Sequence, residues 1–164
     1  MEKTEKVRIY LETSVIGDIC DDTARAETTR EFFRIVTSNT DKYELVVSPI
    51  LIAEINKSPE PQLGFLTFFL DNITITKLPY SQEAENLALL YVSKKVLSKK
   101  HLADLTHIAY AVVAQCDYIL SWDKHFVRAN TMSRVRKTNE QEEYQSPFIV
   151  TPEVFTGESN YVHD

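Results

Sequence analysis

Four acidic residues stand where they could do chemistry together: Glu12, Glu54, Asp104 and Asp123. Glu12 directly follows the apolar run 9–11, as a carboxylate at the end of a buried strand would. Such a group needs solvent, a cation or hydrogen-bond donors, because burying it without partners is costly. Carboxylates that converge repel one another, and a divalent cation relieves that repulsion. A set without His or Cys favours Mg²⁺ or Mn²⁺ over zinc.

The predicted elements explain why these acids should meet. Strands are predicted over 7–11, 43–48, 73–78, 117–122 and within 147–155, and helices over 28–38, 49–58, 61–72, 82–98 and 101–116. This alternation predicts an α/β fold, a three-layer α/β/α sandwich with a mostly parallel central sheet. Ligands of open α/β sheets bind beyond the carboxyl ends of the strands. Glu12 and Asp123 follow strands, and Glu54 and Asp104 are expected in the first turns of helices.

Three smaller features refine these boundaries. Ser48, followed by Pro49, is typical of a helix start, and Ser81 is the expected N-cap of the helix that follows it. The polar stretch 131–147 is expected to be an exposed helix or loop. No internal repeat or interdomain linker is seen, so residues 1–164 are expected to form a single domain.

Composition excludes several classes of protein. Three glycines are too few for the Gly-rich phosphate loops of nucleotide-binding proteins. The net charge of −6 argues against a general nucleic-acid coat protein, although it leaves a local nucleic-acid site open. The two cysteines, Cys20 and Cys116, form no CxxC pair and indicate no disulfide framework. Without a signal peptide or a membrane-spanning apolar run, a cytoplasmic protein with no membrane association is expected.

The ordered set of acids resembles the PIN domains, the metal-dependent nuclease fold of VapC-like toxins in toxin–antitoxin pairs. The resemblance extends from Val7 to Phe155 and rests on four segments. These are "YLETSVIG" around Glu12, "SPILIAEI" around Glu54, "LADLTHIAYAVVAQC" around Asp104, and "SWDKHF", which fits the family's Ser/Thr-x-Asp-x-x-Phe pattern. One departure is Glu12, where the family usually has Asp; its side chain reaches about 1.5 Å further.

The resemblance implies an enzyme, a Mg²⁺- or Mn²⁺-dependent endoribonuclease that hydrolyses RNA phosphodiester bonds. It implies catalytic roles for all four acids. Glu12, Asp104 and Asp123 would be direct or water-bridged metal ligands, and Glu54 would complete the site or orient water. Ser14 and Ser121 would hydrogen-bond the carboxylates from a second shell and fix their rotamers. It also implies a homodimer and an antitoxin protein as partners, with RNA as substrate.

Basic residues near Asp104 and Asp123 are candidates for binding the RNA backbone. The five proposed residues are Lys94, Lys95, Lys99, Lys100 and Arg128. A helix C-terminus explains the first of these equally well, because cations there complement the helix dipole. His107 and His125 lie close to two of the acids but are interpreted as surface or capping groups outside the site.

Other functions remain open at this stage. A catalytically inactive PIN-like module that binds RNA or a protein is the main alternative, and the Glu12 departure favours it. A phosphohydrolase with an Asp nucleophile fits less well, because the first strand lacks two Asp residues spaced two apart. Nothing in the sequence distinguishes RNA from DNA, or one bound metal from two.

Overall fold

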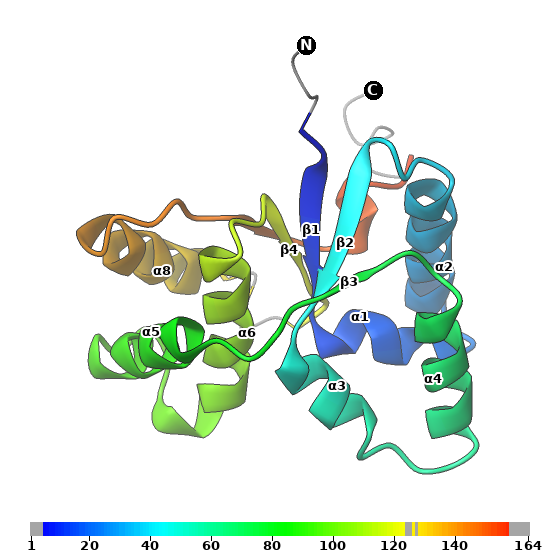
Figure 1. The fold of residues 1–164 in the computed structure, drawn as a ribbon, viewed down its shortest axis with the longest axis horizontal. Coiled ribbons are helices and arrows are strands. Elements are labelled where there is room, and N and C mark those ends of the chain that lie inside the picture. Colours follow the sequence, from blue (N-terminus) through cyan, green and yellow to red (C-terminus); the bar gives the residue numbers. More distant parts are fainter. Residues whose placement is uncertain (1–4, 124–125, 127, 158–164) are drawn as a thin grey trace.

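The computed structural model describes residues 5–123, 126 and 128–157. At its centre is a five-stranded sheet in the order β3-β2-β1-β4-β5, and every strand pair is parallel. The strands are β1 (Val7–Leu11), β2 (Tyr43–Val47), β3 (Thr76–Lys77), β4 (Tyr118–Leu120) and β5 (Phe148–Val150). In register, Ile9 of β1 lies beside Leu45 of β2 and Tyr118 of β4. All carboxyl ends therefore lie at one edge of the sheet, toward which β1 and β2 run downward in Figure 1.

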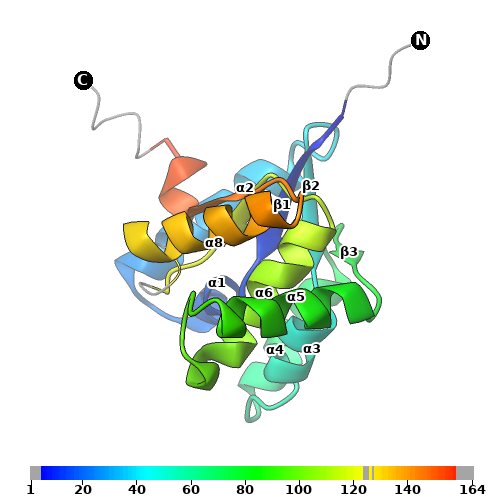
Figure 2. The ribbon, with the colours of Figure 1, turned by 90° about the vertical axis from the view of Figure 1, so that its left-hand side faces the viewer.

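Helices cover both faces of the sheet (Figures 1 and 2). One face carries α1 (Thr13–Gly17), α2 (Ala24–Thr37), α3 (Pro49–Ile55) and α4 (Gln62–Asp71), together with the 3₁₀ turn η1 (Asp18–Cys20). The other carries α5 (Gln82–Ser93), α6 (Leu102–Val113) and α8 (Ala129–Gln141). Two further 3₁₀ turns, η2 (Lys99–His101) and η3 (Pro152–Val154), connect or end elements. The sheet is thus the middle of three layers.

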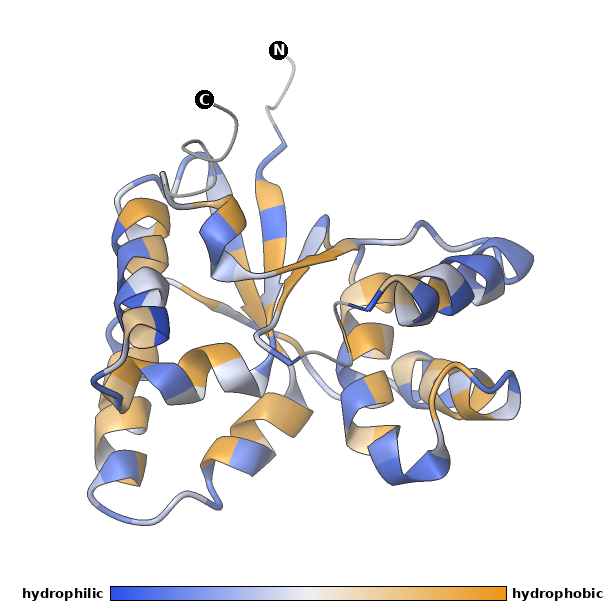
Figure 3. Ribbon diagram, turned by 180° about the vertical axis from the view of Figure 1, so that it is seen from behind, coloured by the Kyte–Doolittle hydropathy of each residue, from blue (hydrophilic) through white to orange (hydrophobic). Residues whose placement is uncertain are grey.

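Side-chain alternation along β1 builds the two cores. Ile9 and Leu11 pack into the core beneath α1 to α4, whereas Tyr10 between them packs beneath α5 and α6. A strand buried on both faces reads as a continuous apolar run, and Figure 3 shows the central strands largely in the hydrophobic colour. The predicted fold class, an α/β/α sandwich with a PIN-like parallel sheet, is confirmed.

Two predicted elements are shorter in the structure for local reasons. The strand predicted over 73–78 is only Thr76–Lys77, because its ladder with β2 is limited to the pairs Val46–Thr76 and Val47–Lys77. The helix predicted over 82–98 ends at Ser93. There Lys95 takes a left-handed conformation (φ 59°), and its N–H and that of Val96 bond back to the carbonyls of Val92 and Tyr91, a Schellman ending.

The polar stretch 131–147, predicted to be an exposed helix or loop, is helical over most of its length. Most of it belongs to α8, and this helix is partly buried instead of exposed. Asn139 is fully buried, and its Oδ1 accepts a 2.5 Å hydrogen bond from the Tyr91 hydroxyl of α5. Its side-chain nitrogen donates to Ser146 Oγ at 2.9 Å. A polar residue therefore helps to dock this helix.

No helix in the described part of the chain combines the length and apolar character needed to cross a membrane.

Candidate active site

Glu12 lies at the carboxyl end of β1 and is 6% exposed. Its backbone still belongs to the sheet edge, since its N–H donates to the Leu120 carbonyl at 3.1 Å. Its side chain caps α1. Oε1 accepts hydrogen bonds from the Ser14 N–H at 3.1 Å, the Ser14 hydroxyl at 2.5 Å and the Ser121 hydroxyl at 2.8 Å. Three hydrogen-bond donors on one oxygen offset the cost of burying the carboxylate, which explains why an acidic residue can end this buried strand.

The same two serines tie Glu12 to the segment after β4. Ser14 Oγ accepts the Trp122 N–H at 2.9 Å, and Ser121 Oγ accepts the Asp123 N–H at 2.9 Å. Each hydroxyl therefore donates to the carboxylate and accepts from the backbone. Ser14 and Ser121 contact the carboxylate as the sequence suggested, while their role beside a metal stays a prediction.

Glu54 approaches the same edge from α3. It lies in the last turn of this short helix and not in its first turn, because α3 ends at Ile55. Its Oε1 accepts hydrogen bonds from the Thr13 hydroxyl at 2.5 Å and from His107 Nε2 at 2.6 Å. Thr13 is the direct neighbour of Glu12, so the two carboxylates share one corner of the fold.

The ionised form of Glu54 is favoured by these contacts. Burial by itself raises the pKa of its carboxyl, but the hydrogen bond and charge of His107, then the Thr13 hydrogen bond and the charge of Lys57, outweigh burial. The net effect is a pKa of Glu54 below its ordinary value. Glu54 is therefore a carboxylate at neutral pH.

Asp104 and Asp123 complete the set of sequence-predicted acids. Asp104 lies in the first turn of α6 as expected, and its Oδ2 is 3.2 Å from Nδ1 of His101. Asp123 follows β4, and its backbone is fixed by Ser121. His107, one turn after Asp104 on α6, already contacts Glu54. The four acids thus come from four segments that end or begin at the carboxyl edge.

Whether the residues suit a divalent cation depends on their free oxygens. In both Glu12 and Glu54 the hydrogen bonds from described residues end on Oε1 and none ends on Oε2. A polar side-chain atom that lacks a hydrogen bond is either buried or in contact with solvent. Among the described residues, Arg8 Nε is the one such atom that is buried, so Oε2 of Glu12 and Oε2 of Glu54 are both open to solvent. Two oriented carboxylates with an open oxygen each fit a hard cation. However, no three His, Cys, Asp or Glu side chains of the described residues form a ready metal site.

The proposed RNA-binding residues lie on the α5–α6 connection and at the start of α8. Lys94 and Lys95 end α5, Lys99 and Lys100 form part of η2, and Arg128 is the N-cap residue of α8; all five are exposed. Lys95 also lines a surface cavity of ≈ 470 Å³ with His101 and Arg134. This basic surface adjoins the start of the Asp104 helix.

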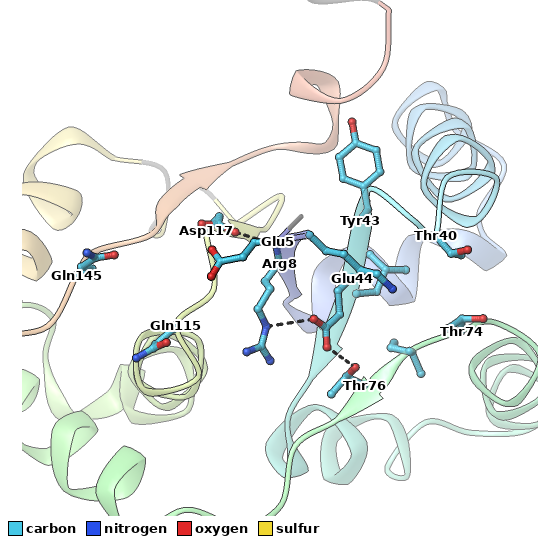
Figure 4. Close-up of a pocket in the computed structure, with 13 residues that line it drawn as sticks. Glu5, Arg8, Thr40, Tyr43, Glu44, Thr74, Thr76, Gln115, Asp117 and Gln145 are labelled. Carbon is cyan, nitrogen blue, oxygen red and sulfur yellow. Dashed lines mark hydrogen bonds and ion pairs between the residues drawn. The ribbon is translucent and has the colours of Figure 1, made fainter. Parts of the chain in front are cut away.

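The opposite edge of the sheet holds a larger cavity of ≈ 680 Å³ (Figure 4). Here Arg8 Nε lies 3.5 Å from Glu44 Oε1, Thr76 donates to Glu44 Oε2 at 2.7 Å, and Asp117 accepts the Arg8 N–H at 2.8 Å. Its acidic lining residues, Glu5, Glu44 and Asp117, outnumber its cations, Lys6 and Arg8. The cavity is far from the candidate acids and electrostatically unsuited to a phosphate backbone.

Two residues at the site were missed in the sequence. His107, interpreted as a surface or capping group, is fully buried and holds Glu54, so that interpretation was wrong. Tyr10, part of the apolar run 9–11, contacts Nδ1 of the His107 ring through its hydroxyl at 2.6 Å. The signal available was the apolar helix around His107, which leaves its imidazole no exposed face. His125 lies outside the described residues.

The chain is therefore an α/β protein with a parallel five-stranded sheet, and the four candidate acids lie on segments that end or begin at its carboxyl edge. No family model and no curated protein matches the sequence. Among solved structures it is similar to a chain of VapBC2 from Rickettsia felis, a complex bound to a DNA fragment from its promoter. That match has 10% identity and a TM-score of 0.58, and it covers 88% of this chain and 98% of that chain.

A second similar structure is the tyrosyl-tRNA synthetase of Archaeoglobus fulgidus complexed with L-tyrosine. It has 11% identity and a TM-score of 0.52, with 90% of this chain and 55% of that chain covered. At such identities the two matches establish the arrangement of strands and helices, and function has to be argued from the site itself. Membership of the PIN family stays a prediction.

Proposed function

We propose that this protein is a metal-dependent endoribonuclease that hydrolyses RNA phosphodiester bonds, and that it is the toxin of a type II toxin–antitoxin pair. The observation that carries the proposal is the shared geometry of Glu12 and Glu54. Each carboxylate is fixed through Oε1 and leaves Oε2 open, at the carboxyl edge of a PIN-like sheet. The similarity to a chain of the VapBC2 complex supports the same class of function.

The residues would divide the work as follows. Glu12, Asp104 and Asp123 would hold Mg²⁺ or Mn²⁺, which when bound supplies positive charge beside the scissile phosphate and makes water more acidic. Ser14 and Ser121 keep the Glu12 carboxylate in one rotamer, so its open oxygen is presented without further ordering.

Glu54 would orient the attacking water. Its ionised carboxylate can accept a hydrogen bond from that water, and the contacts on Oε1 leave Oε2 available for this task. The direction of attack is then set by α3 and α6, because these two helices supply Glu54 and its partner His107.

Cleavage of a mixed-sequence single-stranded RNA tests the proposal. We expect cutting by the wild type with Mg²⁺ or Mn²⁺, none with EDTA, and none by Asp104→Asn. Asp71→Asn is a matched control, because this exposed acid pairs with Lys77 away from the site. If the folded wild type cuts no RNA with either ion, or if Asp104→Asn cuts as fast as the wild type, the nuclease proposal is wrong.

A second candidate is a PIN-like module that binds RNA or a protein without catalysis. One observation favours it: the described residues contain no group of three side chains ready to hold a metal. It predicts RNA binding without metal-dependent cleavage, and equal RNA affinity for the wild type and Asp104→Asn.

The proposed partners are RNA, an antitoxin and a second copy of this chain. RNA would lie on the basic surface of the α5–α6 connection. On α4, Phe65 and Phe68 are 48% and 67% exposed, so they offer apolar area that a protein partner could cover. Sedimentation of the purified chain tests the homodimer, and a monomer at micromolar concentration would contradict it.

A further inference from the structure

The buried imidazole of His107 joins four elements through one line of hydrogen bonds. Its Nε2 lies 2.6 Å from Glu54 Oε1 on α3, and its Nδ1 lies 2.6 Å from the Tyr10 hydroxyl on β1. The Tyr10 hydroxyl lies 2.6 Å from Ser48 Oγ, the N-cap of α3. Thr13 of α1 joins this line from the side by donating to Glu54 Oε1. The line therefore begins and ends on α3, at Ser48 and Glu54.

The contact that reaches Glu54 has a fixed direction. An ionised carboxylate only accepts, so Nε2 of His107 donates to Glu54. The Tyr10 hydroxyl contacts both Nδ1 of the ring and Ser48 Oγ, and Ser48 Oγ also accepts the Leu51 N–H at 3.5 Å. Every polar group of the line therefore has a partner.

Burial makes the ring rigid. His107, Tyr10 and Ser48 are at most 1% exposed, and the His107 and Tyr10 rings pack edge to face with centroids 5.7 Å apart. By contrast, the Glu54 side chain is 31% exposed. A carboxylate on the last turn of a seven-residue helix would otherwise sample several rotamers, so its orientation depends on the buried ring.

We propose that His107 is a positioning residue that fixes Glu54 for the reaction, by holding Oε1 so that Oε2 faces the carboxyl edge of the sheet. This inference rests on the proposed nuclease function for its kinetic consequence. It places the essential contact on Nε2 of the ring, and it makes Tyr10 the group that keeps the ring in place.

Two substitutions separate the two ring nitrogens. In His107→Gln the side-chain amide can reach the position of Nε2 and still donate to Glu54. In His107→Asn the amide reaches only the position of Nδ1, so this variant keeps the contact with Tyr10 and loses the hydrogen bond to Glu54. Both variants replace the same buried ring with an amide, so a general packing effect would affect them alike.

We expect His107→Asn to lower kcat by about a hundredfold, since a misplacement of about 1 Å in a catalytic group has that effect. KM for RNA and the affinity for Mn²⁺ should change less than threefold, and His107→Gln should recover at least a tenth of the wild-type kcat. Equal kcat for the Asn and Gln variants would overturn the proposal.

A second readout does not need catalysis. The Glu54 carboxyl carbon is titrated by NMR in the absence of RNA and metal. We expect the wild type and His107→Gln to keep the Glu54 pKa below its ordinary value, and His107→Asn to lose this shift. A titration unchanged in His107→Asn would overturn the positioning role, even in a protein that cleaves no RNA; absent cleavage with the expected titration would overturn only the nuclease function.

Should the His107 variants not fold, Tyr10→Phe serves instead, because it keeps the ring volume and removes only the hydroxyl. The expected result is a smaller loss of kcat, about tenfold, with KM unchanged and a Glu54 titration shifted toward the ordinary value. Wild-type kcat and titration in folded Tyr10→Phe would contradict the role given to the line of hydrogen bonds.

Discussion

Ser121 Oγ donates a 2.8 Å hydrogen bond to Oε1 of Glu12, across the paired ends of β4 and β1. The same oxygen accepts the N–H of Asp123, so one hydroxyl fixes a candidate carboxylate and the backbone of another. In the same way, the Ser14 hydroxyl donates to Glu12 Oε1 and accepts the N–H of Trp122. Two small hydroxyl groups thus join the Glu12 carboxylate to the backbone of Trp122 and Asp123.

Removal of the Ser121 hydroxyl should destabilise the fold. In Ser121→Ala a charged acceptor loses a donor and the Asp123 N–H loses its acceptor, which costs about 2 kcal/mol of unfolding free energy. Urea unfolding measures this. Ser93→Ala is the matched control, since the hydroxyl of this exposed serine donates to the Leu90 carbonyl of its own helix, and the change should alter stability by less than about 0.5 kcal/mol. Equal effects in the two variants would argue against the bridging role.

Divalent cations should stabilise the wild type and not Glu12→Gln. A ligand present at about a hundred times its Kd adds about 2.7 kcal/mol. For a domain of this size that raises Tm by roughly 5–10 °C. Thermal unfolding with Mn²⁺ and with EDTA measures the shift, and Glu31→Gln, at an exposed site on α2, is the control. An equal shift for the wild type and Glu12→Gln would place the cation elsewhere.

Acid should remove the stability that Glu54 contributes. Its pKa is lowered in the folded state, so the unfolded chain takes up the proton first as pH falls. The contribution is complete well above the ordinary pKa of 4.5 and is lost as pH drops below it toward the folded value. Urea unfolding at pH 7 and pH 3.5 should show the wild type and Glu54→Gln differing more at pH 7. A larger difference at pH 3.5 would contradict this sign.

Local pattern predicted the parts of the fold that depend on neighbouring residues. The strand–helix alternation, the N-caps at Ser48 and Ser81 and the placement of Asp104 in the first turn of α6 all follow from short stretches of sequence. Contacts between segments that are far apart in the sequence could not be predicted from such short stretches. His107 meets Glu54 only because α3 packs beside α6; the apolar neighbours of His107 indicated its burial but did not identify its partner.

The end of α5 and the docking of α8 escaped prediction for different reasons. Helices that end in a left-handed residue usually have Gly there, and Lys95 carries no such signal. Around Asn139 the sequence is polar and charged, which is typical of an exposed helix, yet this one amide is buried against Tyr91. Polar residues that mediate packing are invisible to hydrophobic patterning.

The Tyr91–Asn139 hydrogen bond should matter for stability. Tyr91→Phe leaves the buried Oδ1 of Asn139 without its donor, which costs about 1–3 kcal/mol of unfolding free energy. Tyr80→Phe is the control, because Tyr80 is 64% exposed and its hydroxyl donates to the exposed side chain of Gln82. Urea unfolding of both variants gives the comparison; a loss in Tyr91→Phe no greater than in Tyr80→Phe would mean that α8 docks by apolar contact alone.

RNA binding should depend on the lysines before α6 through their charge. In an Asp104→Asn background, which removes cleavage, Lys99→Ala and Lys100→Ala should each weaken binding similarly for different RNA sequences. Each lost phosphate contact should also lower the slope of log K against log salt by about 0.7. Fluorescence anisotropy at several salt concentrations measures both quantities. Lys42→Ala, at the exposed opposite edge of the sheet, should leave affinity and slope unchanged. A slope that falls with Lys42→Ala and stays constant with the η2 variants would move the RNA path to the other side of the molecule.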